Sequence, residues 1–403
     1  MNEQLLRRAL LEAPLPAQHE AEQRAWRIVG AAFRRRAAAP QPRLRPRLAL
    51  AFVVLVGLLA VLALTPAGAK VSDWIRDVIE PGERAHPALA SLPAPGRLLV
   101  DSPRGPWIVD QHGSKRLLGT YDQATWSPQG LYVAATRRHQ LTALVADPAV
   151  IGEPAGTPHW SLTRPQRVGD PVWAPSGVLV AYLAGHSLRL VWGNGTHDHA
   201  LDRHVLHVAP SWRPDPSGHG NALAYVDADH RVRVVDIDAA RELWRSAPIG
   251  GSIAALDWSA DGRRLLLVGR GFFVVLGRNG RPIGKGPVRG SPEDAAFSPS
   301  GREIALARHT LEGTSELVLV EVDRGGIREQ PVLSRPGHFT DIAWSPDGNW
   351  LLVPWREADT WLFVRPSDRK VSAYSGISRQ FAPGSSGRVG LPRPAGWCCT
   401  ATR

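Results

Sequence analysis

An aromatic residue followed by a tight turn recurs six times between residues 126 and 348. The copies are W-S-P-Q-G (126–130), W-A-P-S-G (173–177), W-R-P-D-P-S-G (212–218), W-S-A-D-G (258–262), F-S-P-S-G (297–301) and W-S-P-D-G (344–348). Successive aromatics are 47, 39, 46, 39 and 47 residues apart, spacings typical of four-stranded propeller blades. Two short stretches rich in Val, Leu and Ile follow each turn, as β-meanders require. We therefore predict an all-β fold, a β-propeller.

The two ends of the repeat region complement each other. Residues 97–119 supply three apolar stretches with no aromatic turn before them, and the C-terminal P-A-G-W-C-C supplies an aromatic strand with no followers. Joining these ends completes a seventh blade and removes the exposed edges of an open ring. We predict a seven-bladed propeller over residues 97–403, closed by N- and C-terminal strands. A six-bladed ring is the alternative if the N-terminal stretches are only an extension.

Each residue of the repeated turn has a structural role. Pro presets φ, Asp or Ser accepts bonds from nearby backbone, and Gly tolerates a positive φ. A flat aromatic side chain at the end of a strand fills the wedge between twisted neighbouring sheets. We therefore expect the blade aromatics to be core residues and not a ligand cage. They are Trp126, Trp173, Trp212, Trp258, Phe297, Trp344 and Trp397.

These turns resemble the repeats of TolB-like propellers, within the wider WD-repeat-like group, over roughly residues 97–400. The resemblance implies a propeller but no particular activity, because the matching residues shape blades. No blade carries a clear Gly-His and Trp-Asp pair, and Gln129, Ser176 and Ser300 replace the turn Asp. A binding role attached to that Asp therefore does not carry over. The layout is similar to actinobacterial membrane proteins, some of which have anti-sigma-factor-like heads.

Residues 48–69 contain no charged side chain, and Leu48 to Leu64 are apolar apart from Gly57. Because about 20 apolar residues cross a bilayer as a helix, we predict a transmembrane helix over residues 47–69. Arg is frequent before this segment and sparse after it, so residues 1–46 are expected in the cytoplasm and the propeller outside, anchored in the cell membrane. A cleaved signal peptide ending at Ala69 is the alternative.

The segments flanking the predicted span are short. Residues 1–46 read as two helices, and Trp26, Val29 and Phe33 share one face of the second. That helix is expected to rest on anionic lipid, or alternatively to dock a cytoplasmic regulator such as a sigma factor. The zinc-binding pattern of many anti-sigma heads is missing, since no Cys precedes Cys398. Residues 70–96 are expected to form a juxtamembrane helix and a Pro-rich linker.

Neither the positive net charge nor the cysteine content identifies a binding partner. The net charge is +11, but ten Arg and four Glu fall within residues 1–47. The large domain is therefore only mildly basic, and we expect no nucleic-acid partner. The two cysteines, Cys398 and Cys399, are adjacent. We expect them to be free or buried thiols, with a vicinal or intermolecular disulfide as the alternative.

Catalytic signatures are missing from the sequence. It contains no G-x-S-x-G elbow, P-loop, dinucleotide fingerprint or H-E-x-x-H. One stretch, residues 196–207, concentrates possible metal ligands: His197, His199, His204 and His207, with Asp198 and Asp202. Such residues also crowd ordinary solvated loops, so we expect no metal and no cofactor, and keep these four histidines as candidates.

Two classes of function remain open. The first is a rigid binding scaffold that offers a face or funnel to an extracytoplasmic protein, peptide or glycan, with signalling through the span as a variant. The second is a cell-envelope hydrolase or lactonase with a site in the propeller funnel. A propeller enzyme needs a convergent polar or metal cluster at the axis, and the sequence does not assemble one. We therefore expect a binding protein and not an enzyme.

Overall fold

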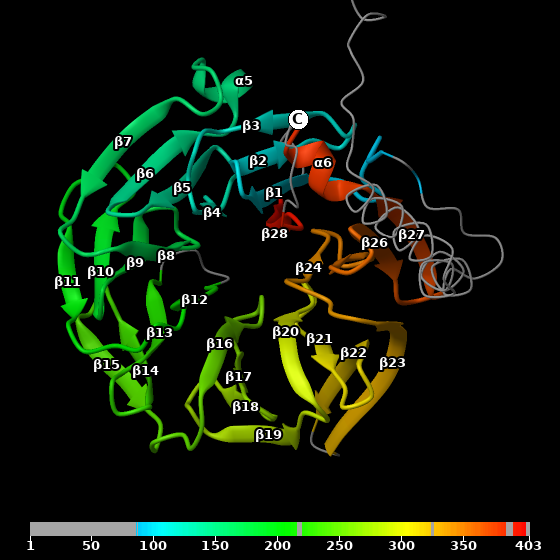
Figure 1. Cartoon of the computed structure of the whole chain (residues 1–403). Coiled ribbons are helices and arrows are strands. Elements are labelled where there is room, and N and C mark those ends of the chain that lie inside the picture. The colour runs from blue at the N-terminus through cyan, green and yellow to red at the C-terminus, as the bar shows by residue number, and fades with distance from the viewer. Residues whose placement is uncertain (1–85, 87, 216–219, 324–325, 384–389, 400–403) are drawn as a thin grey trace, which may run out of the picture. The chain divides into compact units, whose positions relative to one another are not determined.

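The computed structural model describes residues 86, 88–215, 220–323, 326–383 and 390–399. In this part of the chain, strands form seven four-stranded antiparallel sheets, arranged as blades around a central axis (Figure 1). The prediction of seven blades is confirmed, and the six-bladed alternative is wrong.

The blades are numbered from the closing one, with the strands of each given from the axis outward. Blade 1 contains β28 (Arg393–Cys398), β1 (Arg97–Ser102), β2 (Gly105–Val109) and β3 (Lys115–Leu117). Blade 2 contains β4 (Gln123–Trp126), β5 (Tyr132–Arg137), β6 (Gln140–Val145) and β7 (Pro158–Thr163). Blade 3 contains β8 (Val168–Trp173), β9 (Leu179–Ala184), β10 (Ser187–Trp192) and β11 (His199–Asp202).

The remaining four blades follow the same order. Blade 4 contains β12 (Ser211–Arg213), β13 (Ala222–Val226), β14 (Val232–Asp236) and β15 (Arg241–Arg245). Blade 5 contains β16 (Ile253–Trp258), β17 (Arg264–Gly269), β18 (Phe272–Gly277) and β19 (Pro282–Pro287). Blade 6 contains β20 (Ser291–Phe297), β21 (Glu303–His309), β22 (Thr314–Asp323) and β23 (Gly326–Pro336). Blade 7 contains β24 (Ala343–Trp344), β25 (Leu351–Trp355), β26 (Thr360–Arg365) and β27 (Lys370–Ser375).

Blade 1 closes the ring with strands from both ends of the repeat region. β28 pairs antiparallel with β1, placing Trp397 opposite Leu98 and Arg393 opposite Asp101. The C-terminal strand is thus the innermost strand of the blade. Main-chain pairing across this join leaves no open edge between the first and last blades.

The blade aromatics are buried in the ring. All seven side chains predicted as core residues are between 4 and 8% exposed. Three of the tryptophans also donate an indole N–H to the innermost strand of the preceding blade: Trp126 to Gly396, Trp212 to Val172 and Trp344 to Ala296. Each acceptor directly precedes the aromatic of its own blade. These residues therefore fill the space between blades and join them by hydrogen bonds.

The outermost strands were not apparent in the sequence. Only two stretches after each turn were predicted as strands, yet every blade has a fourth, outer strand. These strands, such as β7, β15 and β23, are partly or largely exposed. Because they bury little apolar surface, their sequences lack the hydrophobic pattern that identifies inner strands.

The N-terminal edge of the described region packs onto the propeller. His86 bridges to Tyr374 of β27, and Leu89, Leu92 and Ala94 are buried in one cluster with Trp361. The Pro-rich segment expected to be a spacer therefore contributes, from residue 88 onward, to the core of blades 1 and 7. The juxtamembrane helix, the predicted span of residues 47–69 and the cytoplasmic segment of residues 1–46 lie outside the described residues.

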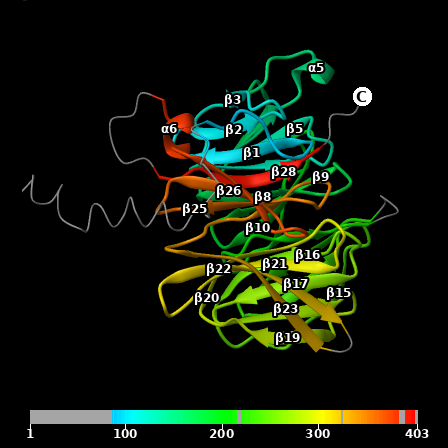
Figure 2. The same cartoon turned by 90° about the vertical axis from the view of Figure 1, so that its right-hand side faces the viewer.

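Two short helices accompany the strands. α5 (Pro148–Ile151) lies in the connection between β6 and β7, and α6 (Ile377–Phe381) follows β27. Phe381 of α6 packs against Trp107 of β2 and Trp361 of β26, so this helix bridges blades 1 and 7 (Figure 2). Neither described helix is long and apolar enough to cross a membrane.

The two cysteines lie at the end of the closing strand, as predicted. Cys398 is the last residue of β28, and Cys399 follows it. The structure joins their sulfurs as a vicinal disulfide. We predicted free or buried thiols, and the structure instead has the alternative, a vicinal disulfide.

Candidate functional site

The two ends of the propeller differ in chemical character. Hydrogen bonds connect the end of one innermost strand to the end of its neighbour, as from Trp126 to Gly396. Others connect the start of one to the start of its neighbour, as between Gln123 and Asp170. The innermost strands therefore run in the same direction along the axis. All repeated turns consequently lie at one end, here called the turn face. The starts of the innermost strands and the turns between second and third strands lie at the other end, the entry face.

The turn face is regular, and the polar side chains of its turns form hydrogen bonds within the turns themselves. In W-S-P-D-G the Ser345 hydroxyl donates to Asp347, and Asp347 accepts the N–H of Asn349. Ser259 and Asp261 repeat this arrangement in blade 5. Gly348 and Gly262 adopt positive φ, as the turn requires. The turn residues thus serve their own backbone, in agreement with the structural role predicted for them.

The entry face contains a pocket of about 340 Å³ near the axis. Its lining comes from the starts of three innermost strands, from the ends of the second strands β5 and β9, and from adjacent connections: Asp122, Gln123, Thr136, Arg167, Val168, Gly169, Asp170, Leu183, Gly185, His207 and Arg393. Carboxylates, guanidinium groups and an imidazole therefore share one concave surface. Such a mixture suits a ligand that offers both hydrogen bonds and charge.

Asp170 has an unusual backbone in this pocket. Its φ is 49°, and the β8–β9 ladder is irregular between Gly169 and Val172. The Gln123 side chain holds the strained residue, accepting from the Asp170 N–H at 2.8 Å and donating to its carboxylate at 3.2 Å. A positive φ in a residue other than glycine costs of order 1–3 kcal/mol and is concentrated at functional sites. The pocket therefore contains a strained, hydrogen-bonded carboxylate.

Three carboxyl groups on the inner strands of their blades are partly buried, and no basic side chain among the described residues forms an ion pair with them. Burial raises the pKa of Asp101 to about 7 although Arg393 opposes the shift, and burial raises the pKa of Asp257 to about 6. Burial likewise raises the pKa of Asp294 to about 7. Asp257 accepts the N–H of Phe297, and Asp294 accepts that of Ile342. These two carboxyls thus join successive blades.

The histidine-rich stretch does not converge. Residues 199–202 form the short outer strand β11, and the other residues of the stretch lie outside it. The His197 ring stacks on Trp192 at 4.3 Å, His199 bonds to the His197 carbonyl, and His204 is exposed. His207 packs against His186, with 4.9 Å between ring centroids. Within the described residues, none of these four histidines belongs to a group of three possible ligands close enough together to hold one metal ion.

The carboxylates of the same stretch are bound to arginines. Asp198, whose side chain is 6% exposed, accepts from the Tyr182 hydroxyl and pairs with Arg164 and Arg189. Asp202 accepts from Tyr225 and pairs with Arg233 at 2.9 Å. Because these carboxylates are already neutralised, they serve the packing of blades 3 and 4.

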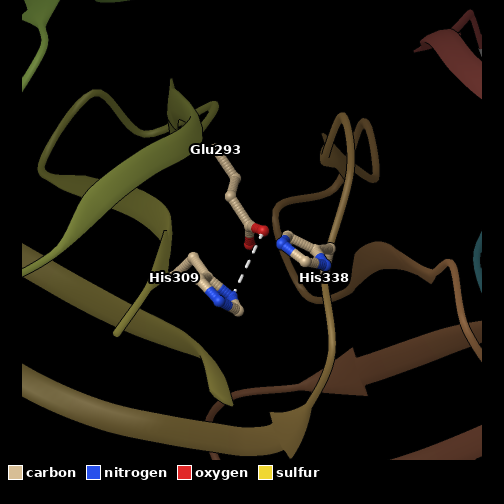
Figure 3. Close-up of side chains that lie close together, drawn as sticks. All are labelled: Glu293, His309 and His338. Carbon is tan, nitrogen blue, oxygen red and sulfur yellow. Dashed lines mark ion pairs between the residues drawn. The ribbon is translucent and has the colours of Figure 1, made fainter. Parts of the chain in front are cut away.

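A cluster of possible ligands does form elsewhere on the entry face. Glu293 of β20, His309 at the end of β21 and His338 in the connection to β24 point toward one another (Figure 3). One ligand atom from each lies within 4.8 Å of the other two. The two imidazole rings are stacked, with centroids 4.1 Å apart, and His309 Nδ1 is 3.9 Å from Glu293 Oε1. We call these three residues the Glu293 cluster.

The surroundings of the Glu293 cluster are polar and specific. The Ser315 hydroxyl and the Phe339 N–H donate to Glu293 Oε2, at 2.7 and 3.2 Å. Burial raises the pKa of Glu293, and those two donors oppose the rise. Sequence reasoning missed this cluster because its members are 16 and 29 residues apart and form no motif. A usable signal was that all three lie where strands begin or end on one face.

Comparisons with known proteins support the fold alone. No protein-family model matches the chain, and no curated protein matches it. A chain of a mitotic checkpoint complex is similar in structure, with a TM-score of 0.51 and 15% identity, covering 74% of this chain and 94% of that one. A chain of hydrazine synthase from Kuenenia stuttgartiensis has a TM-score of 0.47 and 14% identity, covering 69% of this chain and 78% of that one.

Proposed function

We propose that this chain is a single-pass membrane protein whose propeller, outside the cytoplasm, binds a protein, peptide or glycan at its entry face. The anchor rests on the uncharged residues 48–69 and on the Arg-rich residues before them. The TolB-like resemblance of the turns accords with a scaffold of this kind. In the signalling variant, residues 1–46 contact a cytoplasmic regulator such as a sigma factor.

The contrast between the two faces carries the binding proposal. The turn face repeats one self-satisfied motif, whereas the entry face has irregular polar connections and the axial pocket with strained Asp170. The entry face also carries Leu311, a fully exposed residue between β21 and β22, which offers an apolar contact beside a polar pocket.

Site-specific photocrosslinking in native membranes tests the proposal. A photoreactive residue at Arg138 or Leu311 samples the entry face, and one at Gln129 or Asn349 samples the turn face; all four positions are exposed. We expect specific adducts with extracytoplasmic material from the entry face only. Equal adducts from both faces, or none from Arg138 and Leu311, would contradict the assignment.

The anchor and its orientation need a separate test. Full-length protein should stay in membranes after alkaline carbonate extraction, and a deletion of residues 48–64 should release it. A protease added outside the intact cell should digest the propeller and leave residues 1–46 protected. Protection of the propeller would reverse the proposed topology.

One observation favours the enzyme alternative, a hydrolase or lactonase acting in the funnel. Asp101 has an unpartnered Oδ1, and its pKa of about 7 lies where a general acid or base works best. It is also paired along the β1–β28 ladder with Arg393, which lines the axial pocket. A panel of ester and lactone substrates tests this reading: turnover that Asp101→Asn abolishes without loss of folding would favour it over binding.

A further inference from the structure

We propose that Glu293, His309 and His338 form a binding site for a divalent transition metal of the zinc class. The site would join blade 6, which supplies Glu293 and His309, to the connection that enters blade 7, which supplies His338. Two imidazoles and one carboxylate are a ligand set that suits zinc. The inference does not depend on the binding function proposed above.

The first support is a buried oxygen without a partner. The Glu293 side chain is 10% exposed, and its Oε1 has no hydrogen bond although Oε2 has two. Leaving a buried acceptor unsatisfied costs about 1–3 kcal/mol, and more for a charged group. Oε1 is the oxygen nearest the histidine rings, with His309 Nδ1 at 3.9 Å (Figure 3). A cation between the carboxylate and the imidazoles would satisfy it.

The second support is the partner of each histidine. His309 Nδ1 lies 3.0 Å from the Gly337 carbonyl oxygen, and His338 Nδ1 lies 2.9 Å from Glu357 Oε1. A carbonyl and a carboxylate only accept, so each Nδ1 is a donor, and in the neutral ring Nε2 is then the nitrogen whose lone pair can bind a metal. Histidine ligands of metals are typically held in this way by a second acceptor, which fixes the tautomer and makes the ring more basic.

The loop backbone is shaped to hold these second partners. Glu357 accepts from the His338 main-chain N–H at 2.6 Å as well as from its ring, so it grips the residue at two points. A Cβ on Gly337 would lie 2.4 Å from Glu357 Oε2, and Gly337 has a φ of 89°. A side chain at this position would push the Glu357 carboxylate aside. Glu357 is therefore a positioning residue for His338.

The stacked rings show what binding would change. A metal lies in the plane of each imidazole that binds it, whereas the rings of His309 and His338 are nearly parallel at 4.1 Å. One ring must therefore tilt about its hydrogen-bonded Nδ1, and the exposed His338 has more room for this than the partly buried His309. Three protein ligands leave the fourth tetrahedral position of zinc for water or for a group from a ligand.

The location gives the metal a structural consequence. β24 of blade 7 has two residues and is the shortest of the innermost strands. Its few ladder bonds are supplemented by side-chain contacts across the blade boundary, such as the Phe339 N–H bond to Glu293. A metal held from both sides would reinforce this boundary.

Zinc titration of the purified full-length chain in detergent, after removal of metal with a chelator, tests the proposal. We expect one tight site per chain and a zinc-dependent rise in melting temperature. His309→Asn places an amide where Nδ1 lies, keeping the bond to Gly337 while removing Nε2. It and Glu293→Gln should each weaken zinc binding at least tenfold, and Glu357→Gln about tenfold.

Two matched controls separate this site from adventitious binding to other histidines. His186→Asn alters the His186–His207 pair, which lies at a similar ring distance but has no third ligand. A combined His197→Asn, His199→Asn and His204→Asn variant removes three histidines of the histidine-rich stretch. Both variants should retain the tight site.

Cobalt binding provides a second measurement, which would not change if the three side chains had only a structural role. Co²⁺ in a tetrahedral nitrogen and oxygen site absorbs visible light strongly, and this band should appear with the unaltered chain and be lost in His309→Asn. The proposal is overturned if folded Glu293→Gln and His309→Asn bind zinc as tightly as the unaltered chain. It is equally overturned if the unaltered chain shows neither a tight site nor a cobalt band.

Discussion

Two histidine-containing regions of this propeller contrast sharply. Residues 197–207 gather four histidines within eleven positions, yet the structure disperses them and pairs the intervening Asp198 with Arg164 and Arg189. Glu293, His309 and His338 are far apart in the chain, yet their ligand atoms lie within 4.8 Å. Proximity along the chain does not make side chains converge, because an extended chain advances by about 3.3 Å per residue and its neighbouring side chains point to different sides.

The polar groups of the two regions also differ in how their hydrogen-bonding and charge are satisfied. In the histidine-rich stretch the carboxylates are neutralised by arginines, so they stabilise the fold. In the Glu293 cluster one buried oxygen, Glu293 Oε1, has no hydrogen-bond partner, which leaves it available to the metal proposed above. Stability effects should therefore dominate in the first region and ligand effects in the second.

The largest effect is expected at Asp198. Asp198→Ala leaves Arg164 and Arg189 without their common partner, and breaking a buried ion pair in this way costs about 3–5 kcal/mol. Urea unfolding of the variant and the unaltered chain measures the difference. Glu321→Ala, which removes the partner of Arg328 at an exposed pair, should change stability little. Equal losses in both variants would show that Asp198 is not specially placed.

A smaller loss of stability is expected at Gly337, together with a loss of zinc affinity. Gly337→Ala places a Cβ against Glu357 at a φ of 89°, and strain of this kind costs about 1–3 kcal/mol. Because Glu357 would move away from His338, zinc should bind more weakly. Gly313→Ala is the control: its φ is also positive, but its Cβ would meet no atom within 4 Å. It should lose stability without losing zinc.

Asp257 provides a pH-dependent contrast with Asp198, because no arginine in the described part of the chain pairs with it. Burial raises its pKa from 3.8 to about 6, so the folded state disfavours the ionised form. The resulting penalty is absent below about pH 4, grows between pH 4 and 6, and is complete above. Asp257→Asn, which can still accept the Phe297 N–H, should therefore gain up to about 3 kcal/mol relative to the unaltered chain between pH 4 and pH 8. Paired melting curves measure this; a constant difference across that range would disprove it.

The smallest effect is expected in the histidines of residues 197–207. His199 and His204 are exposed, so replacing each by Asn should change the free energy of unfolding by less than about 0.5 kcal/mol. Zinc affinity should also be unchanged. A tenfold loss of zinc affinity in either variant would place a metal site in the stretch and remove the contrast between the two regions.

Much of the architecture was predictable because blades repeat. The turn spacing located the innermost strands, and the unmatched ends identified β28 as the closing strand. The outer strands escaped prediction since they bury too little surface to impose a pattern, as the exposed residues of β23 illustrate. The packing of Leu89 and Leu92 also escaped, because a Pro-rich segment has no periodicity that reveals a docking surface.

The candidate sites were far less predictable. Strained Asp170 follows an ordinary-looking glycine, and its conformation depends on Gln123 from the neighbouring blade. The Glu293 cluster depends on how far strands β20 and β21 extend and on the path of the loop before β24. Neither feature has a spacing that a motif could capture.

By itself, the sequence determined the repeating blades and the aromatic residues between them, because each blade buries the same kind of surface and so repeats the same local pattern; it favoured seven blades but left six open. Only the tertiary structure decided which polar groups meet. Side chains from different blades come together through the curvature of the ring, and ring curvature leaves no periodic trace in the residues that it brings into contact.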